Sequence, residues 1–139
     1  AKTLIAFGAS AISTLPGGFI QNKSAARDYI NAIKAGGLGT NRGVGLTDED
    51  RFRSHIIERL MCDFHVDLEA VCDTFETPVE GLTGALSKLE PLIADELVVV
   101  DGWCMDVLPR GRMLVRMACA VFDQYHTSNP SKPAHAKAI

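Results

Sequence analysis

The sequence predicts a mainly α-helical fold, a helical bundle with a small β-hairpin wing, preceded by one remnant strand of an α/β fold. Apolar residues recur at helical spacing over most of residues 46–125, and a valine-rich run before Asp101-Gly102 predicts a hairpin. An isolated apolar run stands at residues 2–7. The chain has 139 residues, 47% of them hydrophobic and 22% charged, which fits one globular domain with a piece of another.

The first predicted element is the apolar run at residues 2–7, which stops at Gly8. A run of this length predicts a strand that is buried on both faces. No parallel partner stands nearby in the sequence, and a lone strand leaves its backbone groups unpaired. Residues 14–22 contain a Pro-Gly-Gly turn signal and are expected to form a loop. We therefore expect residues 1–22 to be the last strand and loop of a larger fold.

Residues 23–45 are expected to form a helix followed by a linker. Asn22 or Ser24 can cap this helix, which is predicted to run from Lys23 to Ala35. Its apolar stripe consists of Tyr29, Ile30 and Ile33. The segment 36–45 contains five glycines and is predicted to be a linker between domains.

Residues 46–125 are expected to form the helical domain. Thr47 and the acidic residues after it open the clearest helix, because a hydroxyl cap and acids stabilise a helix N-terminus. The apolar residues of this helix recur at helical spacing: Phe52, Ile56, Ile57, Leu60 and Phe64. Asp67 caps a short helix, and Thr77-Pro78 starts another, which Pro91 must bend or end.

The hairpin follows these helices. Val98–Val100 and Cys104–Leu108 flank Asp101-Gly102, which is a tight-turn signal. Pro109 then opens a last amphipathic helix that extends to the end of the domain, and the polar tail at 126–139 is expected to be disordered. Three helices, a two-stranded wing and a further helix follow the order of a winged-helix domain.

The charge balance argues against several classes of partner. The net charge of −3 gives no electrostatic support to a general nucleic-acid or anionic-membrane role. A winged-helix domain that binds DNA places its third helix against phosphates. Here that helix, residues 78–92, carries Lys88 as its one base beside Glu80 and Glu90. DNA binding is kept as an alternative function.

Cysteine usage and the lack of an export signal predict a cytoplasmic protein. No apolar run approaches the roughly 18 residues that span a bilayer, and no signal peptide pattern is present in the sequence. The cysteines are widely spaced, which predicts free thiols and no metal site. They are Cys62, Cys72, Cys104 and Cys119.

Several motifs recur in one order along the chain. They are Gly8–Ser13, Gln21-Asn22, Arg42-Gly43 before Leu46-Thr47, Ile57-x-x-Leu60-x-Cys62-x-Phe64, Leu89-x-Pro91-Leu92, Gly111-Arg112-x-Leu114-Val115-Arg116 and Phe122-Asp123-x-Tyr125. Together they resemble the C-terminal end of oxygen-independent coproporphyrinogen III oxidase, the bacterial radical S-adenosylmethionine enzyme of anaerobic haem synthesis. The resemblance extends from about Thr3 to Tyr125.

The resemblance implies a parent enzyme that oxidatively decarboxylates two propionates of coproporphyrinogen III to give protoporphyrinogen IX. The parent uses a 4Fe-4S cluster on a CxxxCxxC loop and S-adenosylmethionine, and the strand at 1–22 would belong to its radical S-adenosylmethionine barrel. This sequence has no CxxxCxxC loop. We therefore expect no cofactor bound to the fragment and no catalysis by it alone. A related haem chaperone remains an alternative.

The resemblance also assigns candidate site residues. Ile12 stands where the family contacts S-adenosylmethionine, and the small residues around it would let a ligand approach the backbone. The helical domain is expected to cover the barrel mouth, where the porphyrinogen carboxylates need basic and amide partners. The candidates are Gln21, Asn22, Arg27 and Arg42. The alternative is that the bases are surface charges and that Asn22 caps a helix. The missing barrel domain is the expected partner, and an exposed barrel-facing surface would permit dimerisation.

Overall fold

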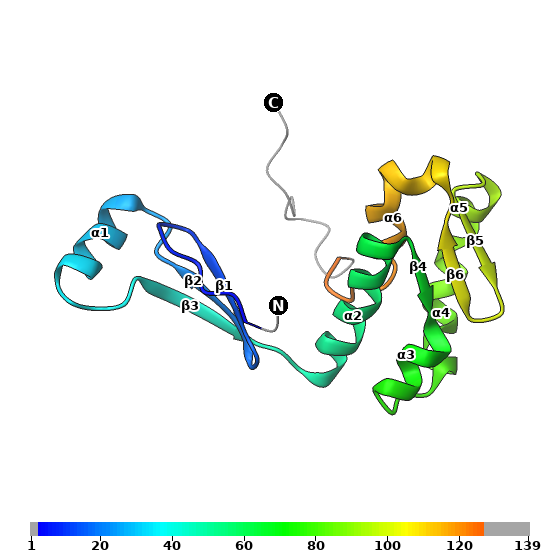
Figure 1. Cartoon of the computed structure of the whole chain (residues 1–139), viewed down its shortest axis with the longest axis horizontal. Coiled ribbons are helices and arrows are strands. Elements are labelled where there is room, and N and C mark those ends of the chain that lie inside the picture. Colours follow the sequence, from blue (N-terminus) through cyan, green and yellow to red (C-terminus); the bar gives the residue numbers. More distant parts are fainter. Residues whose placement is uncertain (1–2, 127–139) are drawn as a thin grey trace. The chain divides into compact units, whose positions relative to one another are not determined.

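A computed structural model describes residues 3–126 of the chain (Figure 1). The chain divides into two compact units, Ala1–Asp48 and Glu49–Ile139. The first contains one helix and the second several, and each contains a small antiparallel sheet. The predicted disorder of the tail concerns residues that lie, apart from His126, outside the described part of the chain.

The first unit is a three-stranded antiparallel sheet with one helix. Its strands are β1 (Ile12–Leu15), β2 (Gly18–Asn22) and β3 (Thr40–Gly45), in the order β1-β2-β3. Helix α1 (Ala26–Lys34) connects β2 to β3 and lies at one end of the sheet (Figure 1). At the outer edge of β1, Leu4 forms a single bridge with Thr14.

This sheet corrects the sequence prediction for the first 45 residues. The expected loop at 14–22 forms most of a β-hairpin, and the expected linker at 36–45 contains β3. Glycines caused the error, because here they permit close strand packing. A Cβ atom at Gly18 would overlap the Val44 carbonyl oxygen across the sheet. The predicted buried strand is not confirmed, since residues 3–7 make one bridge and Phe7 is 86% exposed.

The helix predicted at residues 23–35 is confirmed in shorter form, but its predicted cap is wrong. The N-cap residue of α1 is Ala25, which makes no side-chain cap hydrogen bond. Asn22 lies in β2, and its amide donates to backbone oxygens of the preceding loop instead. The expected apolar stripe is largely exposed, because Ile30 and Ile33 are each 47% accessible.

The second unit begins with a long helix and continues in short helical pieces. The α-helices are α2 (Asp48–Asp63), α3 (Leu68–Thr74), α4 (Thr83–Leu86), α5 (Glu90–Ala94) and α6 (Val115–Ala120). The 3₁₀ turns are η1 (Val79–Leu82), η2 (Ser87–Leu89) and η3 (Pro109–Leu114). The predicted helix after Thr47 and the Asp67 cap are confirmed, since the Asp67 carboxylate accepts from Ala70 N at 3.0 Å.

The two later helices are more broken than predicted. Pro78 precedes η1 instead of occupying its first position, and Pro91 marks the start of α5. The last helix begins as a 3₁₀ turn and becomes α-helical only at α6. At Gly111 a Cβ atom would overlap the Leu97 carbonyl oxygen, so this turn packs directly against the chain before β5.

The second unit also contains the predicted hairpin, formed by β5 (Val98–Asp101) and β6 (Cys104–Val107). A third strand, β4 (His65–Asp67), pairs with β6 and was not predicted, because three residues are too few to show a period. The sheet order is β4-β6-β5. Trp103 at the hairpin turn is half-buried and packs against the core of this unit.

The core of the second unit gathers side chains from its helices and its sheet. The fully buried large side chains are Phe122, Ile56, Leu60, Leu68, Leu82, Leu89, Met105 and Val66. The apolar stripe predicted for α2 supplies three core residues, Phe52, Ile56 and Leu60. No helix among residues 3–126 is long and apolar enough to cross a bilayer.

Candidate functional site

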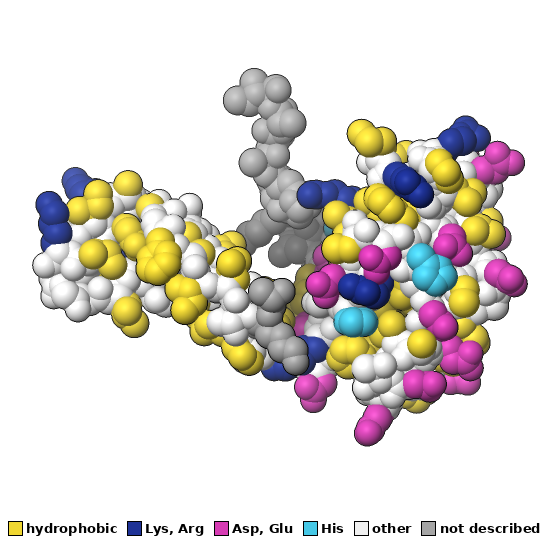
Figure 2. Space-filling view, in the orientation of Figure 1, with side chains coloured by type: hydrophobic (Ala, Val, Ile, Leu, Met, Phe, Trp, Pro, Cys, Tyr) yellow, Lys and Arg dark blue, Asp and Glu magenta, His cyan; other side chains and the backbone are white. Residues whose placement is uncertain are grey.

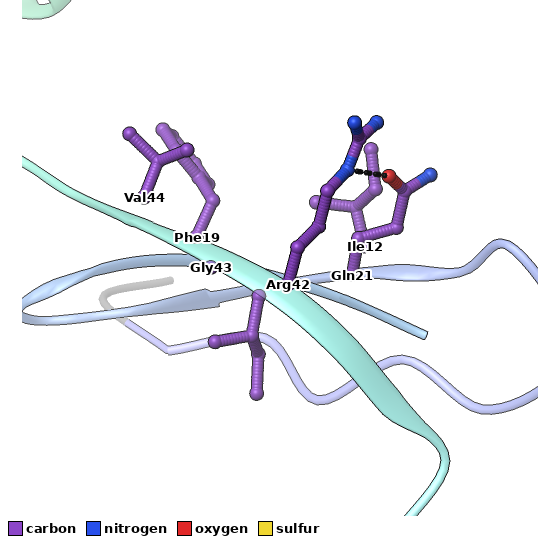
Figure 3. Close-up of a pocket in the computed structure, with 7 residues that line it drawn as sticks. Ile12, Phe19, Gln21, Arg42, Gly43 and Val44 are labelled. Carbon is purple, nitrogen blue, oxygen red and sulfur yellow. Dashed lines mark hydrogen bonds between the residues drawn. The ribbon is translucent and has the colours of Figure 1, made fainter. Parts of the chain in front are cut away.

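One face of the β1-β2-β3 sheet brings together residues that are far apart in sequence. The strand register places Ile12 opposite Gln21, and Gln21 opposite Arg42. The next row on the same face contains Phe19 and Val44. Figure 3 shows these five side chains pointing to the same side of the sheet.

These side chains line an open hollow of about 450 Å³. Its apolar part is accessible, since Ile12, Phe19 and Val44 are 53%, 39% and 64% exposed. Its polar part is a pair in which Arg42 Nε donates to Gln21 Oε1 at 2.8 Å (Figure 3). A guanidinium presents five N–H donors in a planar fork and can bind a carboxylate through two parallel hydrogen bonds. The hollow can therefore accept a ligand that is apolar at one end and anionic at the other.

Three of the five candidates from the sequence meet at this hollow: Ile12, Gln21 and Arg42. Asn22 does not line it and instead binds the loop before β1. Arg27 is exposed on α1 and is also not among the lining residues. Sequence reasoning missed Phe19 and Val44, because their strands were expected to be loop and linker.

The loop that leads into β1 is held by side chains from the rest of the unit. The Gly8 N–H donates to the Tyr29 hydroxyl at 3.1 Å, and Asn22 Nδ2 donates to Gly8 O at 3.0 Å. Gln21 Nε2 donates to Ser10 O at 3.1 Å. Gln21 thus contacts both the loop and Arg42.

Comparisons with known proteins decide the family. Residues 46–114 match the HemN C-terminal domain. This segment belongs to the HemN C-terminal domain family. The match covers the second unit from its first helix to the end of η3, so the short helices and the β4-β6-β5 sheet are those of a HemN C-terminal domain.

The likeness extends beyond that domain. A Bradyrhizobium diazoefficiens oxygen-independent coproporphyrinogen III oxidase is 41% identical over 138 residues, 99% of this chain and 30% of the relative. An enzyme of the same name from Cereibacter sphaeroides (strain ATCC 17025) is 40% identical over 129 residues, 90% of this chain and 28% of the relative. The chain therefore spans about 30% of the length of these curated relatives.

A solved structure supports the same relationship. It is coproporphyrinogen III oxidase (HemN) from Escherichia coli, described as a radical SAM enzyme. It superposes with a TM-score of 0.82 at 31% sequence identity, over 88% of this chain and 29% of that one. The resemblance to oxygen-independent coproporphyrinogen III oxidase, which the ordered motifs indicated, is confirmed.

The second unit contains another apolar hollow, of about 530 Å³, lined in part by Met61, Met117 and Arg116, but none of the sequence candidates lies in it. The cysteines of this unit are unpaired, with Cys62 exposed and Cys72 and Cys119 buried. Burial raises the pKa of the Cys119 thiol to about 11, so this thiol stays protonated at neutral pH. His65 contacts Asp106 at 2.8 Å, and His55 lies against the Phe75 ring. Among residues 3–126, no group of three or more His, Cys, Asp or Glu side chains could hold a metal ion.

Proposed function

We propose that this chain forms part of an oxygen-independent coproporphyrinogen III oxidase and contributes a substrate-binding surface to it. The reaction would convert two propionates of coproporphyrinogen III to vinyl groups and give protoporphyrinogen IX. The observation that carries the proposal is the Ile12–Gln21–Arg42 row, in a chain whose relatives bear this enzyme's name. We also propose that this enzyme acts in the cytoplasm.

Arg42 is proposed to bind a propionate of the porphyrinogen. Its guanidinium is exposed and lies beside the apolar side chains of Phe19 and Val44, on the same sheet face. The tetrapyrrole is apolar at its rings and anionic at its propionates, which suits this combination. Gln21 would orient Arg42 through the 2.8 Å hydrogen bond and could donate to the same carboxylate. Arg27 and Asn22 would contribute less, because neither lines the hollow.

Ile12 is proposed to contact S-adenosylmethionine. This exposed apolar side chain suits van der Waals contact with such a ligand, which supplies the radical chemistry of this enzyme class. The iron-sulfur cluster has no fit here, because the sequence contains no CxxxCxxC and the described residues hold no metal-binding group. We therefore propose that the 139-residue chain does not catalyse by itself and acts with a radical S-adenosylmethionine barrel. The HemN C-terminal domain would cover the barrel mouth.

Two finer structural predictions belong to this proposal. The exposed apolar side chains of Leu4, Ile5 and Phe7 are those that a neighbouring barrel would cover. The domain at 46–125 is proposed to be winged-helix-like. Dimerisation through an uncovered barrel-facing surface also stays a proposal.

The two alternatives are not favoured. Both curated relatives above are named as oxidases, which does not favour a haem chaperone. The visible face of the second unit carries many acidic side chains, which would repel phosphates (Figure 2). This face gives no support to a DNA-binding module.

A hybrid enzyme tests the proposal. This chain would replace the matching 138 residues of the Bradyrhizobium diazoefficiens relative, and protoporphyrinogen formation would be measured against coproporphyrinogen III concentration. We expect an active hybrid in which Arg42→Ala raises KM by about tenfold or more, because the charge-assisted hydrogen bonds from the guanidinium to the propionate are lost. Arg42→Lys should lie between, since it keeps the charge without the fork.

The matched control is Lys34→Ala, which removes an exposed positive charge from α1 in the same unit. It should leave KM within about twofold of the unsubstituted hybrid, because an exposed charge away from the ligand contributes little. An inactive hybrid, or an Arg42→Ala variant with the KM of the control, contradicts the proposed function.

A further inference from the structure

The loop at residues 6–10 is fixed by side chains that lie outside it. Both backbone polar groups of Gly8 are engaged, its N–H by the Tyr29 hydroxyl at 3.1 Å and its carbonyl by Asn22 Nδ2 at 3.0 Å. The Ala6 N–H donates to Ser13 Oγ at 3.0 Å, and Ser13 is buried. The conformation of this loop is therefore set by α1 and by the sheet.

Ser10 shows that the loop is held in a conformation it would not favour alone. Its φ of 61° is left-handed, which disfavours a residue with a Cβ atom. Two hydrogen bonds stabilise it: Ser10 N donates to Lys23 O at 2.9 Å, and Ser10 O accepts from Gln21 Nε2 at 3.1 Å. The second bond joins the loop to the Gln21 amide, whose oxygen accepts from Arg42 Nε.

Tyr29 reaches Gly8 only because residue 39 is glycine. A Cβ atom at Gly39 would overlap the Tyr29 ring, and Gly39 is itself buried. The Gly39 carbonyl accepts from Lys23 N at 2.8 Å, which fixes the backbone under the ring. The ring lies directly against Gly39, and in this position its hydroxyl accepts from the Gly8 N–H.

We propose that Tyr29, seated on Gly39, is a positioning residue for Arg42. The Tyr29 hydroxyl accepts from the Gly8 N–H and so fixes the loop that contains Ser10. The Ser10 carbonyl accepts from the Gln21 amide, whose oxygen accepts from Arg42 Nε and orients the guanidinium. This inference rests on the proposed function for its consequence, which is the affinity for the porphyrinogen propionate. The hydrogen-bond path itself lies within this chain and does not depend on the proposed function.

The first test follows the path in the 139-residue chain by NMR. Tyr29→Phe removes the acceptor of the Gly8 N–H, so Gly8 amide exchange should accelerate about fivefold, the effect of one ordinary hydrogen bond. The Arg42 Nε–H resonance should shift and exchange faster as well. Gly39→Ala should give the same changes, because it displaces the ring. The matched control is Tyr125→Phe, the same substitution at the other tyrosine of the chain, and it should change neither signal.

The double variant Tyr29→Phe with Gly39→Ala decides whether the two residues act together. If they act through one hydrogen bond, the double variant should exchange at Gly8 no faster than Tyr29→Phe alone. Unchanged Gly8 and Arg42 signals in Tyr29→Phe, or additive effects in the double variant, would overturn the inference.

The hybrid enzyme then tests the consequence. Tyr29→Phe should raise KM for coproporphyrinogen III about three- to fivefold and leave kcat within about twofold, as expected for lost positioning without lost chemistry. An active hybrid with unchanged KM would overturn the link to substrate binding. A hybrid that is inactive without any substitution would contradict the proposed function, and the NMR comparison would still decide whether Tyr29 positions Arg42.

Discussion

At the scale of single residues, Asp50 connects the start of α2 to the end of the second unit. Asp50 is only 8% exposed, and its carboxylate accepts from Gln124 Nε2 at 2.9 Å and from the Tyr125 hydroxyl at 2.8 Å. The Phe122-Asp123-x-Tyr125 motif, noted from the sequence without a role, supplies the tyrosine of this contact. This contact holds the last described turn against α2.

The Asp50 contact predicts a dependence of stability on alkaline pH. The hydrogen bond to Asp50 raises the pKa of Tyr125 above its ordinary value of 10.0. Folding therefore favours the neutral phenol, so its contribution is complete below pH 10 and is lost as pH rises through the raised pKa. Tyr125→Phe should lower the free energy of unfolding near pH 8 and weaken its decline above pH 10.

Chemical denaturation at several pH values measures this dependence. Tyr125 is 67% exposed, so the effect should be modest. Some alkaline decline should persist in Tyr125→Phe, because the pKa of Cys119 is also raised, to about 11, by burial. Parallel pH profiles for the two proteins would contradict the assignment.

Single residues also show how far the sequence predicts the candidate site. Gln21 and Arg42 were selected because amide and guanidinium groups suit carboxylates, and the structure places them 2.8 Å apart. Tyr29 was assigned to an apolar stripe, because its helical spacing carries no information about a hydroxyl contact with Gly8. Phe19 was missed since a glycine-flanked segment gives no strand period.

At the scale of elements, helix α3 begins at a well-defined side-chain cap, Asp67. The Asp67 carboxylate accepts from Ala70 N at 3.0 Å, and Asp67 is also the last residue of β4. Asp67→Ala should lower the free energy of unfolding by about 1 kcal/mol, the usual cost of a lost N-cap. Asp67→Asn keeps the acceptor and should stay close to the unsubstituted protein.

Asp73→Ala is the matched control for the Asp67 cap. This exposed acid lies in the last turn of α3, where a negative charge opposes the helix dipole, so its removal should be neutral or slightly stabilising. Thermal unfolding followed by circular dichroism would compare the variants. Equal losses for Asp67→Ala and Asp73→Ala would show that charge, and not capping, determines the effect.

Elements with a strong period were predicted and elements without one were missed. Helix α2 has an apolar stripe over 16 residues, and the β5-β6 hairpin has a turn signal between apolar runs. Strand β3 offered neither, because all of its residues are exposed and two of the six are glycine. Its position depends on pairing with β2, which is a tertiary contact that local sequence does not encode.

At the scale of the whole molecule, the two units differ in how they are stabilised. Every buried hydrophobic side chain among the described residues lies between Phe52 and Phe122. The described part of the first unit buries only Ser13, Gly18 and Gly39. Its sheet is therefore held mainly by hydrogen bonds, while apolar side chains remain on the surface (Figure 2). Exposed apolar side chains on a sheet are typical of a surface that binds a ligand or another domain, as proposed above for this sheet.

The difference in burial predicts unequal local stability, which hydrogen exchange can measure. Backbone hydrogen bonds alone contribute little net free energy, whereas the apolar core contributes most of it. Amides of β1, β2 and β3 should exchange by local opening at low denaturant, and those of α2 and β6 only near the global transition. Ile56→Ala, at a fully buried position, should reduce the stability reported by β6 amides by about 2–5 kcal/mol. Equal protection of the two sheets in the 139-residue chain would show that the first unit is stabilised by something other than its own burial.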